Sequence, residues 1–238
     1  MKREISRLTW TDRRGVLRER LTFALVADLH NCPFDDALDA MAEAGLILVA
    51  GDVTNRHRRG PPPLADAFLR EAPRLAPVYY ALGNHEKRMR GAGAWRQKIL
   101  DSGARLLDNE AILLRPDVML GALSSQPKVH PDLRDASVVD TLAAFDGFRL
   151  LMCHHPEYYP QHVAGHGIDL TLSGHAHGGQ VRIGGQGLYS PGQGLLPRYT
   201  AGWYDDRHLL VSRGMSNHAI VPRINNPCEL IILTLEPG

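Results

Sequence analysis

The stretch Ser173-Gly174-His175-Ala176-His177-Gly178-Gly179-Gln180 decides how the rest of the chain is interpreted. Its two histidines are separated by one residue, flanked by glycines and preceded by an apolar run from Ile168 to Leu172. We expect this run to be a buried strand that ends near Gly174, because glycines leave room for a ligand to approach the backbone. His175 and His177 would then both reach inward. The stretch therefore predicts a metal site at the end of a strand.

Length and composition favour one globular domain over residues 1–238. The chain has 238 residues, of which 44% are hydrophobic and 22% charged. Its 27 basic and 26 acidic residues create no global field for nucleic acid or a membrane surface. We therefore expect no stable nucleic-acid partner, although a peripheral membrane contact stays open, as does the oligomeric state.

The sequence predicts a cytoplasmic location. Residues 1–20 lack the central apolar block of a signal peptide or anchor. No apolar run approaches the roughly 18 residues of a membrane span. The three cysteines lie far apart, which argues against a disulfide framework and for a reducing compartment.

Three apolar strands in the first half deliver polar residues at their carboxyl ends. Leu21 to Ala27 leads to Asp28-Leu29-His30, Leu46 to Ala50 to Gly51-Asp52, and Val78 to Leu82 to Gly83-Asn84-His85-Glu86. Segments with helical spacing, 34–44 and 64–75, fill the gaps between them. This is the βαβ pattern, in which sites form at the carboxyl edge of a parallel sheet.

The second half adds further strands and a second histidine motif. Strands are predicted over 105–114, broken by a turn at Asp108-Asn109, over 118–124, and over 148–153 before His154-His155-Pro156. Later strands are expected at 209–212 and 230–235, and an edge strand at 3–10. The fold class is α/β, a layered sandwich whose second half is expected to be mostly antiparallel.

Seven of these strand-end residues could form a site for two metal ions. They are Asp28, His30, Asp52, Asn84, His154, His175 and His177. One ion would take Asp28, His30 and His177, and the other Asn84, His154 and His175, with Asp52 bridging both. A water between ions roughly 3.5–4 Å apart would be deprotonated and attack a phosphate ester in line. His85 completes neither ligand set, so it is the predicted catalytic residue, binding a phosphate oxygen or protonating the leaving group.

The donor set limits which metals fit. Imidazole, carboxylate and amide groups without a thiolate point to two divalent ions, with Mn²⁺ preferred and Fe, Zn or Co as alternatives. A lone buried histidine is usually structural, but a purely structural role is a poor explanation for a whole set of ligand-type residues that follow predicted strands in order. His155 is the exception. It is expected to point elsewhere, because adjacent residues on a strand face opposite sides.

The ordered motifs resemble the calcineurin-like metallophosphoesterase family, whose pattern is D-x-H, GD, GNH[DE], H and GHxH. Each element is present, at Asp28, Asp52, Asn84, His154 and His175 respectively. The resemblance spans about residues 21–235. It implies a two-sheet β-sandwich flanked by helices, and metal and catalytic roles that match those given above.

The segment GHAHGGQ and the motifs after it resemble a bacterial branch of this family. Its better-known members are phosphodiesterases, and some cleave the pyrophosphate of UDP-diacylglucosamine. Ala176 stands where that branch usually has threonine. The resemblance implies a metal-dependent phosphodiester hydrolase that acts on a small anionic phosphate ester.

Three other interpretations stay open: a catalytically silent metal-binding scaffold of the same fold, a phosphomonoesterase and a nuclease. Basic residues after the motifs offer a clue to the substrate. Arg56, Arg58 and Arg59 follow Asp52, and Lys87, Arg88 and Arg90 follow His85, with Arg198, Arg213 and Arg223 in the tail. They could attract an anion, but solvated loop charges are an equally good account of the first two groups.

Overall fold

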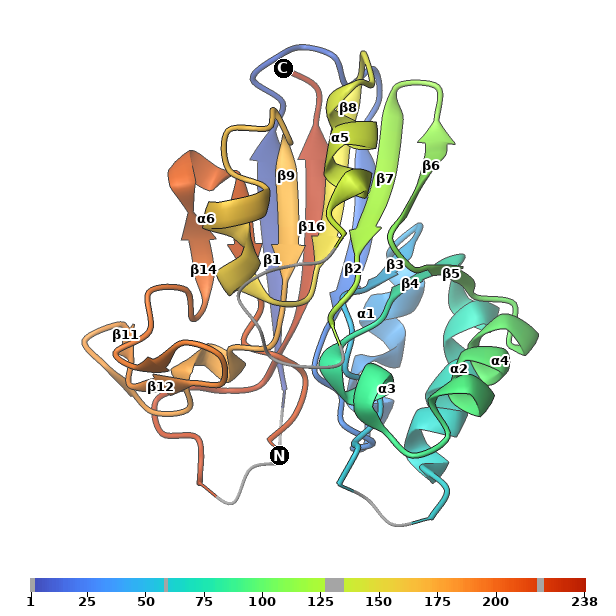
Figure 1. Cartoon of the computed structure of the whole chain (residues 1–238), viewed down its shortest axis with the longest axis vertical. Helices are drawn as coiled ribbons and strands as arrows, with labels where there is room; N and C mark the ends of the chain where they lie inside the picture. The colour runs from blue at the N-terminus through green and yellow to red at the C-terminus, as the bar shows by residue number, and fades with distance from the viewer. Residues whose placement is uncertain (1–2, 58–59, 127–134, 218–220) are drawn as a thin grey trace.

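Two six-stranded sheets packed face to face form the frame of the molecule (Figure 1). The computed structural model describes residues 3–57, 60–126, 135–217 and 221–238. In spatial order, the first sheet contains β1 (Glu4–Thr11), β16 (Glu229–Glu236), β2 (Leu21–Val26), β3 (Ile47–Val49), β4 (Val78–Ala81) and β5 (Arg105–Leu107). The second contains β14 (Gly202–Tyr204), β15 (Leu209–Val211), β9 (Leu170–Ser173), β8 (Phe148–Cys153), β7 (Val118–Leu123) and β6 (Glu110–Arg115). The predicted α/β sandwich is confirmed, and β1 lies at an edge as expected.

The apolar run in β2 is continuous because both of its faces are buried. Phe23 and Leu25 pack between the sheets with Leu150 of β8. Ala24 and Val26 face the opposite way, into a second core beneath helices. Successive side chains of a strand alternate between faces, so a strand covered on both sides needs apolar residues at every position.

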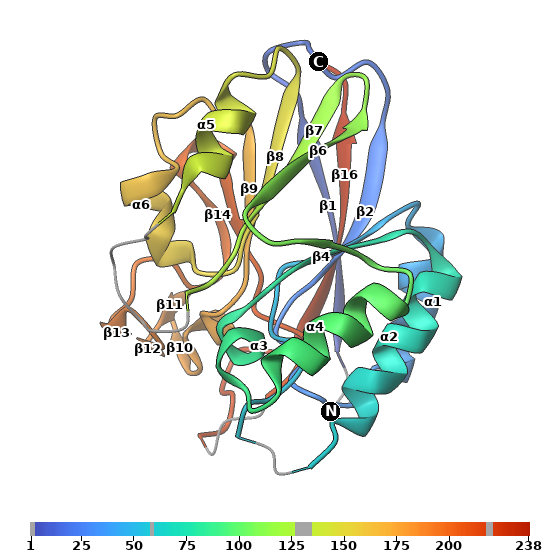
Figure 2. The ribbon, with the colours of Figure 1, turned by 45° about the vertical axis from the view of Figure 1, so that its right-hand side comes forward.

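Helices cover the outer faces of both sheets (Figure 2). Those over the first sheet are α1 (Leu38–Glu43), α2 (Pro63–Leu75), α3 (Asn84–Arg88) and α4 (Ala92–Asp101), and those over the second are α5 (Ser137–Ala143) and α6 (Tyr159–His162). Helix α2 begins at Pro63, whose fixed φ suits a first turn. Its Phe68 lies edge-on against Phe34, in the core that covers the first sheet. The layers are therefore helix, sheet, sheet, helix.

The expectation of a mostly antiparallel second half is wrong. Strands β7, β8, β9 and β15 run parallel to their neighbours in that order. In this sheet, as far as it is described, antiparallel pairing is confined to the edge strands β6 and β14. The physical reason is the connections: α5 leads from β7 to β8, and α6 from β8 to β9. Each crossover returns the chain to the same end, so the next strand runs parallel.

Shorter elements complete the chain. Two small hairpins follow the histidine stretch, β10 (Arg182–Ile183) with β11 (Gln186–Gly187), and β12 (Tyr189–Ser190) with β13 (Gly194–Leu195). The 3-10 helices are η1 (Asp35–Ala37), η2 (Pro156–Tyr158), η3 (His177–Gly179) and η4 (Asp205–Arg207). At the predicted turn, Asn109 has a φ of 56°, and there the chain passes from the first sheet to the second. Among the helices of the described residues, none has the length and apolar character that crossing a bilayer requires.

Asp117, in the turn between β6 and β7, ties this corner of the sandwich together. Its carboxylate accepts hydrogen bonds from the Arg18 backbone at 2.7 Å and from Arg115 Nε and Nη2 at 3.1 and 3.0 Å. Burial opposes ionisation, but these donors prevail and hold the pKa of Asp117 below its ordinary value. The stability it contributes is therefore present above the ordinary carboxyl pKa and lost as pH falls through the lowered one.

We predict that Asp117→Asn lowers the free energy of unfolding at about pH 7 by about 1 kcal/mol, since solvent screens a partly exposed pair. Urea unfolding of both proteins at about pH 7 and about pH 3 measures this, and the difference should shrink at the lower pH. Exposed Asp146→Asn is the matched control. An equal difference at both pH values would contradict the assignment.

Candidate metal centre

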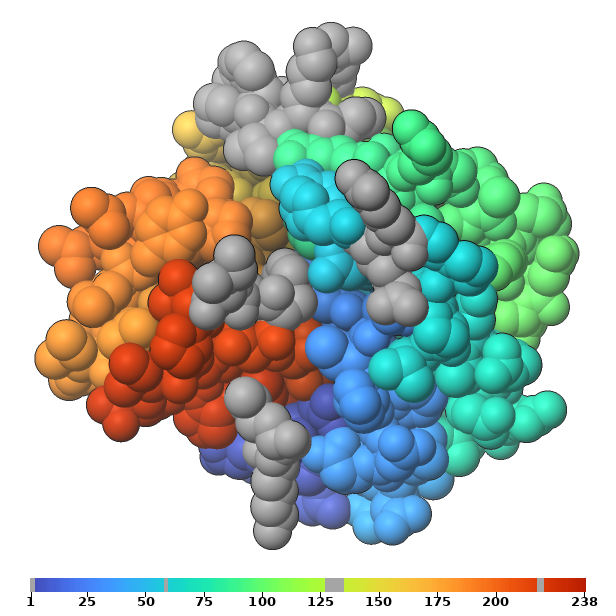
Figure 3. All heavy atoms as spheres, turned by 90° about the horizontal axis from the view of Figure 1, so that it is seen from below, coloured from blue at the N-terminus to red at the C-terminus, as the bar shows by residue number. Residues whose placement is uncertain are grey.

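All seven predicted ligands lie together, at the carboxyl ends of five strands from both sheets. Asp28 and His30 follow β2, Asp52 follows β3, Asn84 follows β4, His154 follows β8, and His175 and His177 follow β9. Their side chains and that of His85 are buried, with residue exposures between 0 and 6%. Figure 3 shows this end of the molecule, where segments from the beginning (blue), middle (cyan) and end (orange and red) of the chain meet.

Asp28, His30 and His177 form one compact group. Their ligand atoms all lie within 4.8 Å of one another. Asp28 Oδ1 is 3.6 Å from His30 Nε2 and 3.5 Å from His177 Nε2, and the two ring nitrogens are 3.1 Å apart. This Oδ1 atom is buried and accepts no hydrogen bond within the described residues. Oδ2 instead accepts one from the His175 backbone at 2.9 Å, which fixes the carboxylate. The trio fits a cation.

The second group gathers Asp52, Asn84, His154 and His175. His154 Nδ1 donates to the Ala50 carbonyl at 2.7 Å, so in a neutral ring Nε2 is the lone-pair nitrogen. That nitrogen lies 3.0 Å from Asp52 Oδ2, and two acceptors at this distance require a positive charge between them. Asn84 Oδ1 and His175 Nε2 are also buried, and neither has a hydrogen-bond partner in the described part of the chain. These four residues also fit a cation.

The charges of this group point the same way. Burial alone would lower the pKa of His154, but Asp52 and then Asp28 raise it to about 10. Burial would likewise raise the pKa of Asp52, but His154, followed by His85 and His30, holds it well below its ordinary value. His175 differs: burial and then His155 lower its pKa to about 3, so it is a neutral donor. The buried carboxylates thus stabilise a proton on His154, at a position that a metal ion would occupy.

Asp52 lies between the two groups. Its carboxylate is within 4.8 Å of ligand atoms of Asp28 and His30 from the first group, of His154 from the second, and of His85. Oδ1 accepts a hydrogen bond from the His85 backbone at 2.8 Å. This central position is where a bridging ligand would have to lie, and the bridging role stays a prediction.

The backbone at these ligands is strained. Asp28, His30, Asp52, His175 and His177 all have left-handed φ angles, from 49 to 64°. For residues with a side chain, such conformations cost of order 1 kcal/mol each and concentrate at functional sites. The neighbouring glycines are required by space, since a Cβ on Gly83 would lie 2.1 Å from Asp52 Oδ1 and one on Gly174 would lie 2.5 Å from Asp28 Oδ2. The glycine-rich motifs thus let backbone and carboxylate share one small volume.

His85 is oriented by one backbone hydrogen bond. The Arg56 N–H donates to His85 Nδ1 at 3.2 Å, so in a neutral ring the proton is on Nε2. Nε2 lies 4.0 Å from Asp52 Oδ2, next to the predicted ligands. The ring therefore faces the site with the nitrogen that can donate a proton.

Glu86 holds the backbone of the site in place through hydrogen bonds, a role that the sequence did not predict. Its Oε2 accepts the N–H groups of Asp52 at 2.9 Å and Gly83 at 3.0 Å. Its Oε1 accepts the Thr54 N–H and the Tyr80 hydroxyl, each at 3.1 Å. Burial, followed by repulsion from Asp52, raises the pKa of Glu86 to about 7. The motif contains this glutamate, but its long-range partners are visible only in the fold.

His155 does not point away from the site, so that expectation is wrong. Its ring centroid lies 3.9 Å from that of His175, and its Nδ1 is 2.8 Å from Glu157 Oε1. A ligand atom of His155 is also within 4.8 Å of those of His154 and His175. The physical reason is that β8 ends at Cys153, so the alternation of a strand does not extend to His155.

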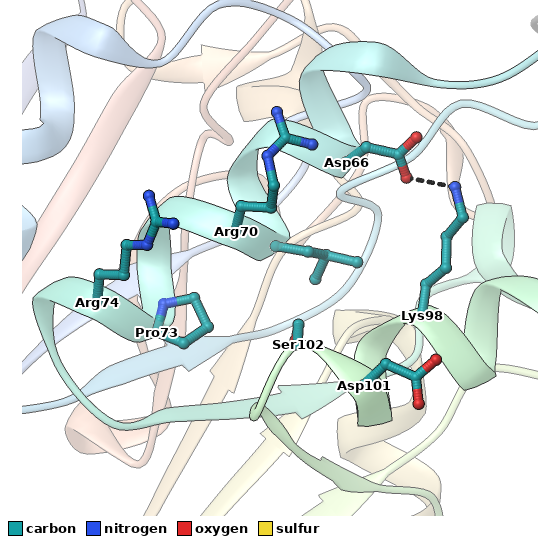
Figure 4. A pocket seen from close by; sticks show the side chains of 8 residues that line it. Asp66, Arg70, Pro73, Arg74, Lys98, Asp101 and Ser102 are labelled. Carbon is teal, nitrogen blue, oxygen red and sulfur yellow. Dashed lines mark hydrogen bonds and ion pairs between the residues drawn. The ribbon is translucent and has the colours of Figure 1, made fainter.

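Two cavities lie near this end of the molecule. One, of about 790 Å³, adjoins the catalytic candidate, since Thr54 to His57 line it together with Met89 to Gly91. The other, of about 620 Å³, is a groove between α2 and α4. Figure 4 shows its charged lining, including the Asp66–Lys98 ion pair at 2.7 Å. No predicted ligand lines either cavity, but the first adjoins the site through Arg56, whose N–H donates to His85 Nδ1.

Known proteins resemble parts of this sequence. A model of the calcineurin-like phosphoesterase family matches residues 21–179. The uncharacterized protein YpbG of Bacillus subtilis is 36% identical over 86 residues, which span 36% of this chain and 30% of YpbG.

Two solved structures are also similar to this chain. Haemophilus influenzae NAD nucleotidase covers 90% of this chain at 14% identity and a TM-score of 0.49, over 44% of its own length. Thermus thermophilus sulfate thiohydrolase SoxB covers 63% at 20% identity and a TM-score of 0.41, over 34% of its length. The chain thus spans less than half of each solved structure.

We predict that Glu86→Gln lowers the free energy of unfolding of metal-stripped protein by about 2–4 kcal/mol. The amide nitrogen cannot accept, so two of the four buried donors lose their partner. Urea unfolding measures the change, and exposed Glu110→Gln is the matched control. A loss no larger than that of the control would contradict the supporting role.

We also predict that Asp52→Asn weakens both metal sites at once, because a neutral amide replaces the central carboxylate. Elemental analysis after gel filtration measures the bound metal, with Asp146→Asn as the control. Two ions retained in Asp52→Asn would show that Asp52 does not bridge. Loss of one ion alone would assign it to a single site.

Proposed function

The chain belongs to the calcineurin-like phosphoesterase family, and on this premise we propose that it is a dinuclear-metal-dependent phosphodiesterase. The observation that carries the proposal is the convergence of ligand atoms of Asp28, Asp52 and His154 within 4.8 Å, where buried Asp28 Oδ1 and His154 Nε2 have no hydrogen-bond partner among the described residues. The substrate is a small anionic phosphate ester. We place the protein in the cytoplasm, where its three cysteines, none of them in a disulfide, would stay reduced.

The residues divide into two ligand sets. Asp28, His30 and His177 would hold one ion, and Asn84, His154 and His175 the other, with Asp52 shared. Mn²⁺ is the preferred cofactor, and Fe, Zn or Co accept the same donors. When bound, two such ions acidify a water molecule and polarise phosphoryl oxygens.

The protein's own groups orient and complete the reaction. The Asp28 and Asp52 carboxylates are fixed by backbone donors, so they cannot rotate away from the ligand histidines. His85 holds a proton on Nε2, as its Nδ1 contact with Arg56 requires, and donates it to the departing oxygen. The cavity lined by Thr54 to His57 lies next to the His85 ring, since the His57 and His85 ring centroids are 5.6 Å apart, and offers space for the alcohol portion of the substrate.

The alternatives differ in what they require. A silent scaffold needs neither a complete ligand set nor His85, yet both are present. A nuclease needs an extended basic groove, which a net charge of +1 does not favour. A phosphomonoesterase would use the same ligands, so only substrate comparison separates it from a diesterase.

We predict that metal-stripped protein regains hydrolysis of bis(p-nitrophenyl) phosphate when Mn²⁺ is added, with slower turnover of p-nitrophenyl phosphate. His175→Ala should lose Mn²⁺ and activity together. His85→Ala should keep two ions but lose about 10²–10⁴-fold in kcat. This variant lacks the proton donor, so its kcat should fall further on diphenyl phosphate, whose leaving group is less acidic.

Each part of this experiment can contradict the proposal separately. Two bound ions without turnover of either ester would favour the scaffold, and faster monoester turnover would favour the phosphomonoesterase. Unchanged kinetics in His85→Ala would remove this residue from the mechanism. Equal losses on both diesters would remove it only as the proton donor.

A further inference from the structure

Most basic side chains near the metal centre already have structural partners. Lys87 pairs with Asp108 at 2.7 Å. Arg213 pairs with Glu229 and Glu4, and the Nη2 of Arg223 is engaged by the Ser216 carbonyl and His177 Nδ1. Arg58 and Arg59 fall outside the described residues. The basic groups expected to attract an anion are thus largely committed to the fold.

Arg88, the last residue of α3, differs from Lys87 and Arg213, which are paired, and from Arg223, whose unpartnered Nε and Nη1 do not share one edge of the guanidinium. Its Nε and Nη2 atoms are shielded from solvent, and no described residue accepts a hydrogen bond from either. These two nitrogens lie on one edge of the guanidinium, where their N–H bonds run parallel and match two oxygens of a carboxylate or phosphate. A donor pair buried without an acceptor is costly. Burial, followed by repulsion from Arg56, accordingly lowers the pKa of Arg88.

Other unpartnered donors lie around this edge. The Tyr158 ring stacks on that of His155 with centroids 4.8 Å apart, and His155 contacts the predicted ligand His175. Burial raises the pKa of Tyr158 to about 12, and the positive charge of Arg88 acts against that rise. The Tyr158 hydroxyl, which lies beside the Gln126 backbone N–H, and the Ser125 hydroxyl are both buried, and neither donates to an acceptor among the described residues. The Ser125 N–H donates to the Leu82 carbonyl at 3.1 Å, which places Ser125 next to the strand that leads into α3. Donors from three segments thus lack an acceptor.

We propose that the Arg88 edge, with the Tyr158 hydroxyl, binds a second oxyanion carried by the substrate. This rests on the proposed diesterase function, because a phosphodiester has only two non-bridging oxygens and both would face the metal ions. A paired donor needs two further oxygens, so it cannot be filled by the reacting group. The substrate class is therefore a phosphodiester that also bears a carboxylate or a phosphate.

A binding experiment tests this without turnover. Mn²⁺-loaded protein is titrated calorimetrically with propylphosphonate, 4-phosphonobutyrate and 1,3-propanediphosphonate, which share a three-carbon chain and differ only in the second group. We expect the wild-type protein to bind at least one of the two probes that carry a second acid group about tenfold or more tightly than propylphosphonate, as charge-assisted paired hydrogen bonds allow. The preferred probe identifies carboxylate or phosphonate as the second group.

Arg88→Lys is the discriminating variant, since it keeps the positive charge but lacks the paired donors. The tenfold preference should vanish in Arg88→Lys and in Arg88→Met, and persist in the control Arg105→Lys, which is exposed at the start of β5. Propylphosphonate binding should stay unchanged in all of them. Equal affinity of the wild-type protein for the three probes, or a preference that survives in Arg88→Lys, would overturn the proposal.

Kinetics separate this proposal from the function on which it rests. On p-nitrophenyl propyl phosphate and p-nitrophenyl 2-phosphonoethyl phosphate, Arg88→Lys should raise KM about tenfold for the second ester only, with kcat unchanged, because binding of a non-reacting group is lost. An equal fall in kcat on both esters would place Arg88 at the reacting phosphate and overturn the proposal. If the wild-type protein hydrolyses neither ester, the diesterase function fails, while the titration still decides whether Arg88 binds an oxyanion.

Discussion

Two buried carboxylates, Asp28 and Asp52, set the requirement that the rest of the structure meets. Neither is exposed to more than 1%. An ionised carboxylate removed from water is costly unless positive charge or hydrogen bonds compensate it. Here the compensation comes from histidines and backbone N–H groups, which hold the pKa of both acids below the ordinary range although burial opposes this. The sandwich brings five strand ends to one place, and the carboxylates explain why so many histidines must accompany them.

Glu86 extends this requirement into the fold. Its two oxygens collect donors from the ends of β3 and β4 and from Tyr80 in the core, so one side chain joins the loops that carry Asp52 and Asn84. The raised pKa of about 7 shows that these donors only partly offset burial and the nearby negative charge. A third buried carboxylate would be unfavourable in a core chosen for stability alone. Its place is understandable because it fixes the left-handed backbone at Asp52, which has a φ of 58°.

The sequence predicts the parts of the structure that depend on local pattern. Apolar runs followed by Asp28, Asp52 and Asn84 are sufficient to place these residues at one sheet edge, because the carboxyl ends of parallel strands meet there. Pairing direction in the second sheet is not local, since it depends on how α5 and α6 return the chain. His155 faces the site, contrary to expectation, because the period-2 alternation of side chains ends with β8 at Cys153. The partners of Glu86 lie up to 34 positions away along the chain, beyond the reach of any motif. The metal-binding and catalytic roles themselves stay predictions.

The segment after Gln180 holds the histidine loop in place. Asn226 donates to the His177 carbonyl at 2.7 Å and to the Gln180 carbonyl at 3.1 Å. Gly178 lies so close to Asn226 that a Cβ there would be 2.0 Å from its Oδ1. The histidine loop is thus held from outside by a segment more than forty residues later in the chain. Because His177 has a left-handed φ of 49° and a glycine on its carboxyl side, it could not keep one orientation unaided. The segment around Asn226 completes the loop that carries His175 and His177. The position of His177 therefore depends on a residue close to the end of the chain.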